Sequence, residues 1–235
     1  MLAKGEAISA ADLIHMAAAG LGRLRRPAFD ARATTELARF GLPFFPATRY
    51  ALAPSALLTI LNDVIINNRR AVLELGSGYS SVYIAKALGE HGRVVTVDAD
   101  AGWLDQVMDS ADRAGVAGRI TAVHAPPRVN GSDARPWYDA EKILATIDDA
   151  PIDLLLVDGP VASSKATARA RAPAVPLLKG RLAGRCSIYL DDIHRPSHAA
   201  IARDWGGELG LRFAFHHARG GYALAMRGDG FDPVM

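Results

Sequence analysis

From residue 71 onward the sequence alternates short apolar runs with segments long enough to form helices. The runs are apolar nearly throughout, which is typical of strands that are buried on both faces of a sheet. The intervening segments 79–89, 102–114 and 163–179 have the length of crossover helices. We therefore predict an α/β fold with a doubly wound, mostly parallel sheet. The expected strands are 71–75, 93–98, 119–124, 152–158, 185–191, 211–216 and 222–226.

The connections between the runs predict further features of the chain. Only a few residues around Gly220 and Gly221 separate the last two runs. That connection is too short for a crossover, so these two strands should form an antiparallel hairpin at one end of the sheet. We expect one long coil, at 125–140, and long coils inside compact domains often carry function.

The first 70 residues contain no convincing strand. Two short helices are expected over 9–19 and 29–40, because glycines and Pro27 interrupt the pattern between them. A third helix should begin at Pro54 and present one apolar face. We therefore divide the chain into an N-terminal helical extension that acts as a lid, 1–53, and a main domain, 54–235.

Charge is nearly balanced over the 235 residues, with 27 basic and 25 acidic residues and a formal net charge of +2. A dedicated nucleic-acid binder carries a clustered basic excess, so nucleic acid is not an expected partner. The apolar stretches fall far short of the ~20 residues that span a bilayer, and we expect a cytoplasmic protein with no membrane contact. The single cysteine, Cys186, excludes an intramolecular disulfide and should be a small apolar residue in a strand.

A glycine-rich turn follows the first predicted strand, in the sequence Glu74-Leu75-Gly76-Ser77-Gly78. Glycines there let the backbone approach a ligand closely, and Ser80 or Ser81 can cap the helix that follows. Asp98 stands twenty residues after Gly78, at the end of the second strand, where an acid can bind both hydroxyls of a ribose. Together these features predict an adenosine site at the carboxyl ends of neighbouring strands.

The same features distinguish between adenosine cofactors. A dinucleotide fingerprint has a third glycine where this chain has Ser81. The carboxylate of Glu74 would repel the pyrophosphate of a dinucleotide, whereas it would attract a cationic cofactor. At these residues, and in its seven strands with a terminal hairpin, the sequence resembles the class I S-adenosylmethionine-dependent methyltransferases over about residues 54–228.

The resemblance implies a Rossmann-like methyltransferase fold with S-adenosylmethionine as its cofactor. It implies that Glu74, Gly76 and Gly78 surround the methionine end of the cofactor and that Asp98 holds its ribose. The residues assigned to the cofactor are Glu74, Gly76, Ser77, Gly78, Ser80, Asp98, Ala99, Trp103, Ala125 and Asp158.

Carboxylates gather at the ends of the fourth and fifth predicted strands. Asp158 follows the fourth strand, and Asp191 and Asp192 follow the fifth. If these strands are neighbours, the three side chains reach one crevice, where they repel each other unless a cation or a proton intervenes. Oxygen ligands without clustered His or Cys favour Mg²⁺ or another hard divalent cation.

This arrangement is similar to that of the metal-dependent O-methyltransferases related to the catechol enzymes, which implies that Asp158, Asp191 and Asp192 bind the ion. Two departures are evident: Asp192 replaces the commoner Asn, and Gly159-Pro160 stands where those enzymes usually place a catalytic Lys soon after the first Asp. The chain is also similar to bacterial methyltransferases that combine Trp-Tyr-Asp, Val-Asp-Gly-Pro and Leu-Asp-Asp-x-x-Arg-Pro, here 137–139, 157–160 and 190–196.

Three interpretations of the acidic cluster stay open. Asp158, Asp191 and Asp192 bind a metal, or catalysis is metal-free with Asp158, Asp192 and His194 in the pocket, or the carboxylates are structural. His194 is the candidate general base, two residues after the Asp pair. We interpret the basic segment with Lys165, Arg169 and Arg171 as a solvated helix face, with binding of an acidic acceptor as the alternative.

The preferred function is transfer of a methyl group to a hydroxyl of a small-molecule acceptor, with a homodimer kept as a hypothesis for the assembly. Aromatic side chains of the extension and of the 125–140 coil would line the acceptor pocket, or would only anchor the helices to the core. They are Phe44, Phe45, Tyr50, Trp137 and Tyr138. The alternatives are N-methylation or macromolecule modification, a binding module without turnover, and a nicotinamide-dependent oxidoreductase.

Overall fold

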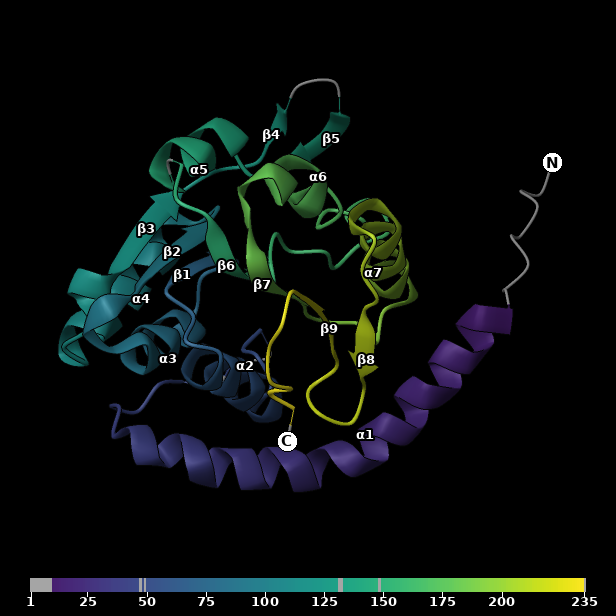
Figure 1. Cartoon of the computed structure of the whole chain (residues 1–235), viewed down its shortest axis with the longest axis horizontal. Helices are drawn as coiled ribbons and strands as arrows, with labels where there is room; N and C mark the ends of the chain where they lie inside the picture. Colours follow the sequence, from purple (N-terminus) through teal and green to yellow (C-terminus); the bar gives the residue numbers. More distant parts are fainter. Residues whose placement is uncertain (1–9, 47, 49, 131–132, 148, 235) are drawn as a thin grey trace.

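A computed structural model describes residues 10–46, 48, 50–130, 133–147 and 149–234 of the chain. Its main feature is a seven-stranded sheet in the order β3-β2-β1-β6-β7-β9-β8, which confirms the predicted fold class (Figure 1). The strands of this sheet are β1 (Ala71–Leu75), β2 (Arg93–Asp98), β3 (Ile120–His124), β6 (Ile152–Val157), β7 (Leu182–Leu190), β8 (Ala214–His216) and β9 (Tyr222–Arg227).

Strand direction in the sheet decides where the predicted site residues meet. β1 pairs in parallel with both β2 and β6, and β6 pairs in parallel with β7. The carboxyl ends of these four neighbouring strands therefore lie along one edge of the sheet. β9 runs antiparallel to both β7 and β8, so the expected terminal hairpin is confirmed.

Helices cover both faces of the sheet, as the apolar strands require. Alternate residues of a strand enter opposite cores: Val72 packs with one set of helices and Leu73 with the other. One set consists of α2 (Pro54–Ile66), α3 (Tyr79–Leu88) and α4 (Ala101–Arg113); the other consists of α5 (Ala140–Ile147), α6 (Ala174–Leu178) and α7 (Pro196–Leu209). Cys186 is buried within β7, as expected.

The N-terminal extension differs from the expectation of two short helices. A single helix, α1 (Ala10–Leu37), runs through both glycines and Pro27 and continues into a short 3₁₀ turn (Ala38–Phe40). Figure 1 shows α1 bending along the edge of the molecule, and a proline inside a helix removes one hydrogen bond and favours such a bend. Close packing explains the glycine at position 22, because an added Cβ would lie 2.5 Å from the Cβ of His217. Ser9, where the first expected helix begins, lies outside the described residues.

Two further expectations were wrong in detail. The expected coil at 125–140 contains a two-stranded antiparallel hairpin, β4 (Arg128–Asn130) and β5 (Asp133–Trp137). The expected crossover helix at 163–179 is α-helical only over α6, and turns precede it. Pro173 and Pro176 explain the second difference, because a proline cannot donate its backbone N–H and disfavours helical geometry in the residue before it.

None of the helices in the described part of the chain has the length and apolar character needed to cross a membrane.

Candidate active site

The glycine turn after β1 lies against the end of β6. Gly76 has φ +99°, a conformation that favours glycine, and an added Cβ would lie 2.7 Å from the backbone nitrogen of Gly159. Gly159 N–H in turn donates to Leu75 O at 2.6 Å. The missing Cβ of Gly76 therefore lets the turn pack directly on Gly159. Ser77 Oγ beside it is buried with no hydrogen-bond partner among the described residues, and such an unpaired hydroxyl fits a bound polar ligand.

Glu74 is fully buried beneath this turn and holds the start of α3 in place. Its carboxylate accepts hydrogen bonds from the hydroxyls of Ser80 at 2.5 Å, Thr96 at 2.8 Å and Ser81. Burial raises the pKa of Glu74 to about 7, against the opposing effect of these three hydroxyls. Ser80 and Glu74 are thus bonded to each other, and Gly78 forms the N-terminal boundary of α3.

Asp98 ends β2 beside the glycine turn, at the position expected for the ribose. Its two oxygens accept backbone N–H bonds from Ser77 and Asp100, each at 3.0 Å. Burial raises the pKa of Asp98. Ala125 follows β3 and donates its N–H to Asp98 O at 2.8 Å, so the ends of β2 and β3 are tied together.

Trp103 lies in the first turn of α4 and faces the same turn. Its indole Nε1–H donates to Ser77 O at 2.8 Å, and its ring meets that of Tyr79 edge-on with centroids 5.7 Å apart. Ala99 is partly buried against the core next to Asp98. The structure therefore brings all the residues assigned to the cofactor to one sheet edge, where Trp103 braces the glycine turn.

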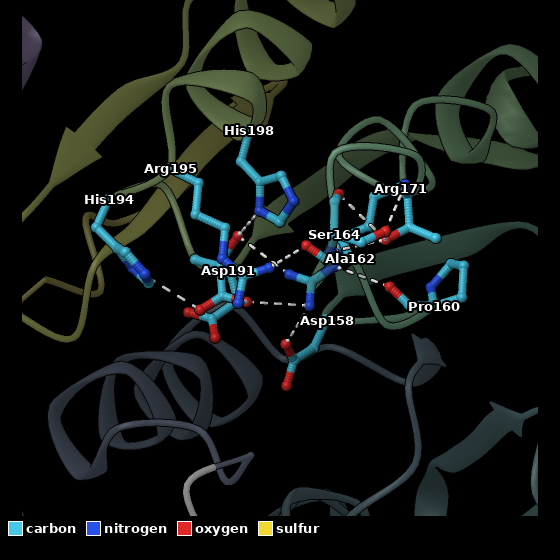
Figure 2. Close-up of polar contacts among 11 residues, drawn as sticks. Asp158, Pro160, Ala162, Ser164, Arg171, Asp191, His194, Arg195 and His198 are labelled. Carbon is cyan, nitrogen blue, oxygen red and sulfur yellow. Dashed lines mark hydrogen bonds and ion pairs between the residues drawn. The ribbon is translucent and has the colours of Figure 1, made fainter.

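The three aspartates of the predicted metal set come together at the ends of β6 and β7. One carboxylate oxygen from each of Asp158, Asp191 and Asp192 lies within 4.8 Å of the other two. Figure 2 shows the guanidinium of Arg171 reaching this group from the segment before α6. Arg171 Nη2 lies 3.1 Å from Asp158 Oδ1 and 3.2 Å from Asp192 Oδ2, so one cation bridges two of the three carboxylates.

Arg171 is the site residue whose position sequence reasoning missed. It is buried rather than part of a solvated helix face, and it also donates to Asp191 O at 3.2 Å and Pro160 O at 3.4 Å. Arg169, by contrast, remains on the surface and pairs with Asp204. The one available signal was Pro173, which argues against a regular solvated helix at this point.

Burial and neighbouring charges raise the pKa values of two of the aspartates. Burial raises the pKa of Asp158 to about 7, and Asp192 adds to this rise while Arg171 opposes it. Burial and then the charge of Asp158 hold the pKa of Asp191 well above its usual range. Asp192 has φ +62°, a conformation uncommon outside glycine that aspartate tolerates better than most residues and that often occurs at functional sites.

Two histidines flank the aspartates, and they differ in what they can do. His194 is partly exposed, with Nδ1 3.8 Å from Asp192 Oδ1. His198 is completely buried at the start of α7, and Nδ1 lies 3.2 Å from Asp191 O (Figure 2). Burial, followed by the charge of Arg171, lowers the pKa of His198 to about 4, so this ring is neutral at physiological pH. His194 is therefore the histidine able to exchange a proton with solvent.

The aromatic side chains of the expected lid separate into two groups. Trp137 and Tyr138 are almost fully buried, and the Tyr138 hydroxyl approaches Gly159 so closely that an added Cβ there would lie 2.1 Å from it. Trp137 therefore packs in the core, whereas the Tyr138 hydroxyl reaches the edge where Asp158 and Asp98 lie; a role of either ring in lining the acceptor pocket stays a prediction. Phe45 stacks on Tyr79 with ring centroids 4.8 Å apart, whereas Phe44 and Tyr50 are exposed.

Comparison with known proteins gives consistent matches. A family model described as a methyltransferase domain matches residues 73–193. A curated relative, catechol O-methyltransferase from Mycobacterium tuberculosis, is 32% identical over 91 residues, covering 38% of this chain. The aligned segment spans 36% of that relative, about a third of its length.

Solved structures match over more of the chain. An O-methyltransferase from Streptomyces achromogenes, described as involved in tomaymycin synthesis and solved with SAM, is 19% identical over 86% of this chain and 90% of its own, with a TM-score of 0.54. An O-methyltransferase from Bacillus cereus in complex with SAH is 18% identical over 86% of this chain and 91% of its own, with a TM-score of 0.53. At these identities the matches show a shared fold.

Proposed function

Because this chain belongs to the methyltransferase-domain family and has the class I fold of S-adenosylmethionine-dependent methyltransferases, we propose that it transfers a methyl group to a hydroxyl of a small molecule. The observation that carries the proposal is the convergence at one sheet edge of the glycine turn, the acid Asp98 and a cluster of three aspartates. A cofactor held by Gly76, Ser77 and Asp98 would direct its methionine end toward that cluster.

The transfer is an in-line displacement. The acceptor oxygen attacks the methyl carbon, the bond from that carbon to sulfur breaks, and the electron pair remains on sulfur in neutral S-adenosylhomocysteine. Positioning supplies much of the acceleration in such a step. The acceptor hydroxyl also loses its proton, and His194 is the group we assign to take it, with Asp192 3.8 Å from its Nδ1. Partial exposure lets His194 return that proton to solvent.

The aspartates also fit a divalent cation. Arg171 supplies one positive charge beside three carboxyl groups, and Asp191 Oδ1 is buried without a hydrogen-bond donor among the described residues. Such an all-oxygen set suits Mg²⁺. Asp158, Asp191 and Asp192 would hold the ion, which when bound supplies a Lewis acid that lowers the pKa of an acceptor hydroxyl. Arg171, which also donates to Pro160 O, keeps Asp158 and Asp192 oriented.

The extension completes the proposed active site as its lid. His15 of α1 lies 2.6 Å, through Nε2, from Ile193 O, next to the proposed base. Phe45 rests on Tyr79 at the first residue of α3. These contacts support a role for 1–53 in closing over the acceptor, and the exposed Phe44 and Tyr50 suit an apolar or ring-bearing one.

The decisive experiment measures S-adenosylhomocysteine formation by purified protein with a panel of catechols, phenols and matched amines. We expect turnover with hydroxyl acceptors and a large loss of kcat in His194→Gln. Loss of activity after EDTA dialysis, restored by Mg²⁺, would support the cation; unchanged activity would leave His194 as the sole route. Tight binding of S-adenosylmethionine with no methylated product across the panel would overturn the proposal in favour of a binding module.

A further inference from the structure

Helix α1 carries two apolar faces, and the fold uses one of them. The buried face includes His15, Ala19, Gly22, Ala33 and Leu37. His15 packs against the ring of His217 at a centroid distance of 4.7 Å, and Asp30 on the same side accepts a 2.5 Å hydrogen bond from the Ser55 hydroxyl of α2. This face fixes α1 to the rest of the molecule (Figure 1).

The second face is exposed and has the spacing of a coiled-coil seam. Its members follow one another at alternating intervals of four and three residues, as a and d positions do. At 100° per residue this row lies roughly opposite the buried face. The row, called the outer seam below, consists of Ala10, Ile14, Ala17, Leu21, Leu24 and Ala28.

The outer seam is too apolar to be an ordinary helix surface. Ile14 is 70% exposed, Leu21 66% and Leu24 80%, and the neighbouring Leu13 and Met16 are more than half exposed. Ile14, Leu21, Leu24 and the adjacent Leu13 expose on the order of 500 Å² of apolar surface, toward the upper end for a monomer, whereas Met16 lies on a different side of the helix. That area approaches the ~800 Å² that each partner contributes to a stable interface. A helix that is apolar on both sides is normally covered on both sides.

We propose that the outer seam of α1 binds the outer seam of a second copy of this chain, with the two helices antiparallel. In that orientation a positions face d positions, so Ile14 lies opposite Leu24 of the second copy and Ala17 opposite its Leu21. The pattern is self-complementary about the middle of the seam, as a two-fold interface requires.

The proposal has a consequence for the site. The inner face of the same turn of α1 touches Ile193 O through His15, next to His194. An interface on the outer seam would therefore stabilise the contact between α1 and the loop that contains Ile193 and His194. The interface does not depend on the proposed methyl transfer, so the two can be tested separately.

The first test is the oligomeric state of the full chain by light scattering and sedimentation. We expect wild type at twice the chain mass of 25.0 kDa, and a Leu21→Glu/Leu24→Glu variant at the single-chain mass. The matched control is Ile65→Glu/Ile66→Glu, two apolar residues of α2 that are 57% and 49% exposed, and it should stay dimeric. Circular dichroism and S-adenosylhomocysteine binding would verify that each variant is folded.

Cysteine crosslinking tests the orientation. An Ile14→Cys/Leu24→Cys chain should form a disulfide-linked dimer, whereas each single variant should not; the native Cys186 is buried and does not interfere. A monomeric wild type at tens of micromolar, or a control that dissociates as readily as the seam variant, would overturn the proposal. A monomeric wild type that sediments with anionic phospholipid vesicles would overturn it in favour of a membrane surface. Crosslinking of Leu24→Cys alone would overturn the antiparallel pairing.

Discussion

At the scale of single residues, Arg171 and Glu74 carry the unusual energetics of the site. Each is a charged or titratable group with almost no exposure, and each contacts several partners from other elements. Burying such a group is costly unless its partners are in place. Substitutions at these two residues should therefore change the free energy of unfolding more than substitutions in an exposed ion pair do.

Replacing Arg171 should strongly destabilise the fold. Arg171→Met leaves Asp158 and Asp192 without the cation between them, and removing one partner of a buried ion pair costs about 3–5 kcal/mol. Urea unfolding at pH 8 measures the loss, which should shrink at pH 5 because burial raises the pKa of Asp158 to about 7 and the protonated carboxyl needs no counter-charge. Arg169→Met is the matched control, since its pair with Asp204 is largely exposed and should contribute at most about 1 kcal/mol. Equal losses in both variants would contradict the ion-pair role.

Glu74 should make stability fall as pH rises. Its pKa is raised from 4.5 to about 7 in the folded protein, so the folded state holds a proton that the unfolded state releases. The stabilisation is therefore complete below about pH 4.5 and is lost as pH rises through 7, on the order of 3 kcal/mol in total. Urea unfolding from pH 4.5 to 8 measures this slope, and Glu74→Gln should reduce it and leave the part that Asp158 contributes, whose pKa is also raised to about 7. Glu36→Gln, on α1, should keep the wild-type slope.

At the scale of elements, the connection between α1 and α2 depends on one side chain. Asp30 Oδ1 accepts the backbone N–H of Ser55 at 3.1 Å and its hydroxyl at 2.5 Å, at the second residue of α2. A carboxylate at this position satisfies a free N–H group of the helix start and interacts favourably with the helix dipole. Helix α1 thus supplies the cap that α2 lacks in its own sequence.

Removing that cap should cost about 1–2 kcal/mol in the free energy of unfolding. Asp30→Ala is the test variant, measured by urea denaturation with far-ultraviolet circular dichroism. Asp30→Asn keeps an acceptor oxygen and should recover part of the loss. A full loss in both variants would indicate that the pair with Arg26, at 3.2 Å, matters more than the cap.

At the scale of the whole molecule, cofactor binding should stabilise the folded chain. Product at a hundredfold excess over its dissociation constant adds about 2.7 kcal/mol, which corresponds to a rise in Tm of about 5–10 °C for a chain of this size. Differential scanning fluorimetry with S-adenosylhomocysteine measures the shift, and calorimetry gives the dissociation constant.

Gly76→Ala should abolish that shift, because its Cβ would meet Gly159 N at 2.7 Å and its φ is +99°. Asp98→Ala should weaken the shift while leaving the turn intact. Gly118→Ala, with open space around it, is the control that should behave as wild type. A full shift in Gly76→Ala would contradict the assignment of this turn to the cofactor.

The sequence by itself determined the sheet, its parallel core and the edge at which the site lies. Apolar runs separated by helix-length segments admit few other folds, and the bounds of β1 and β2 follow their runs residue by residue. The residues after each strand could therefore be placed at one edge, since carboxyl ends of parallel strands coincide there. The positions of Glu74, Gly76, Asp98 and Asp158 at this edge could be predicted from their places in or after the strands alone.

Only the tertiary structure decided which charges compensate each other and which helix faces remain uncovered. Arg171 meets Asp158 and Asp192 across 13 and 21 residues of chain, through turns whose path no local pattern specifies. Helix α1 likewise continues through Pro27, although a proline inside a helix costs about 3 kcal/mol, and the contacts of α1 with α2 and α7 are long-range contacts that no local pattern shows. Long-range packing thus fixed both the counter-charge of the aspartates and the exposed outer seam.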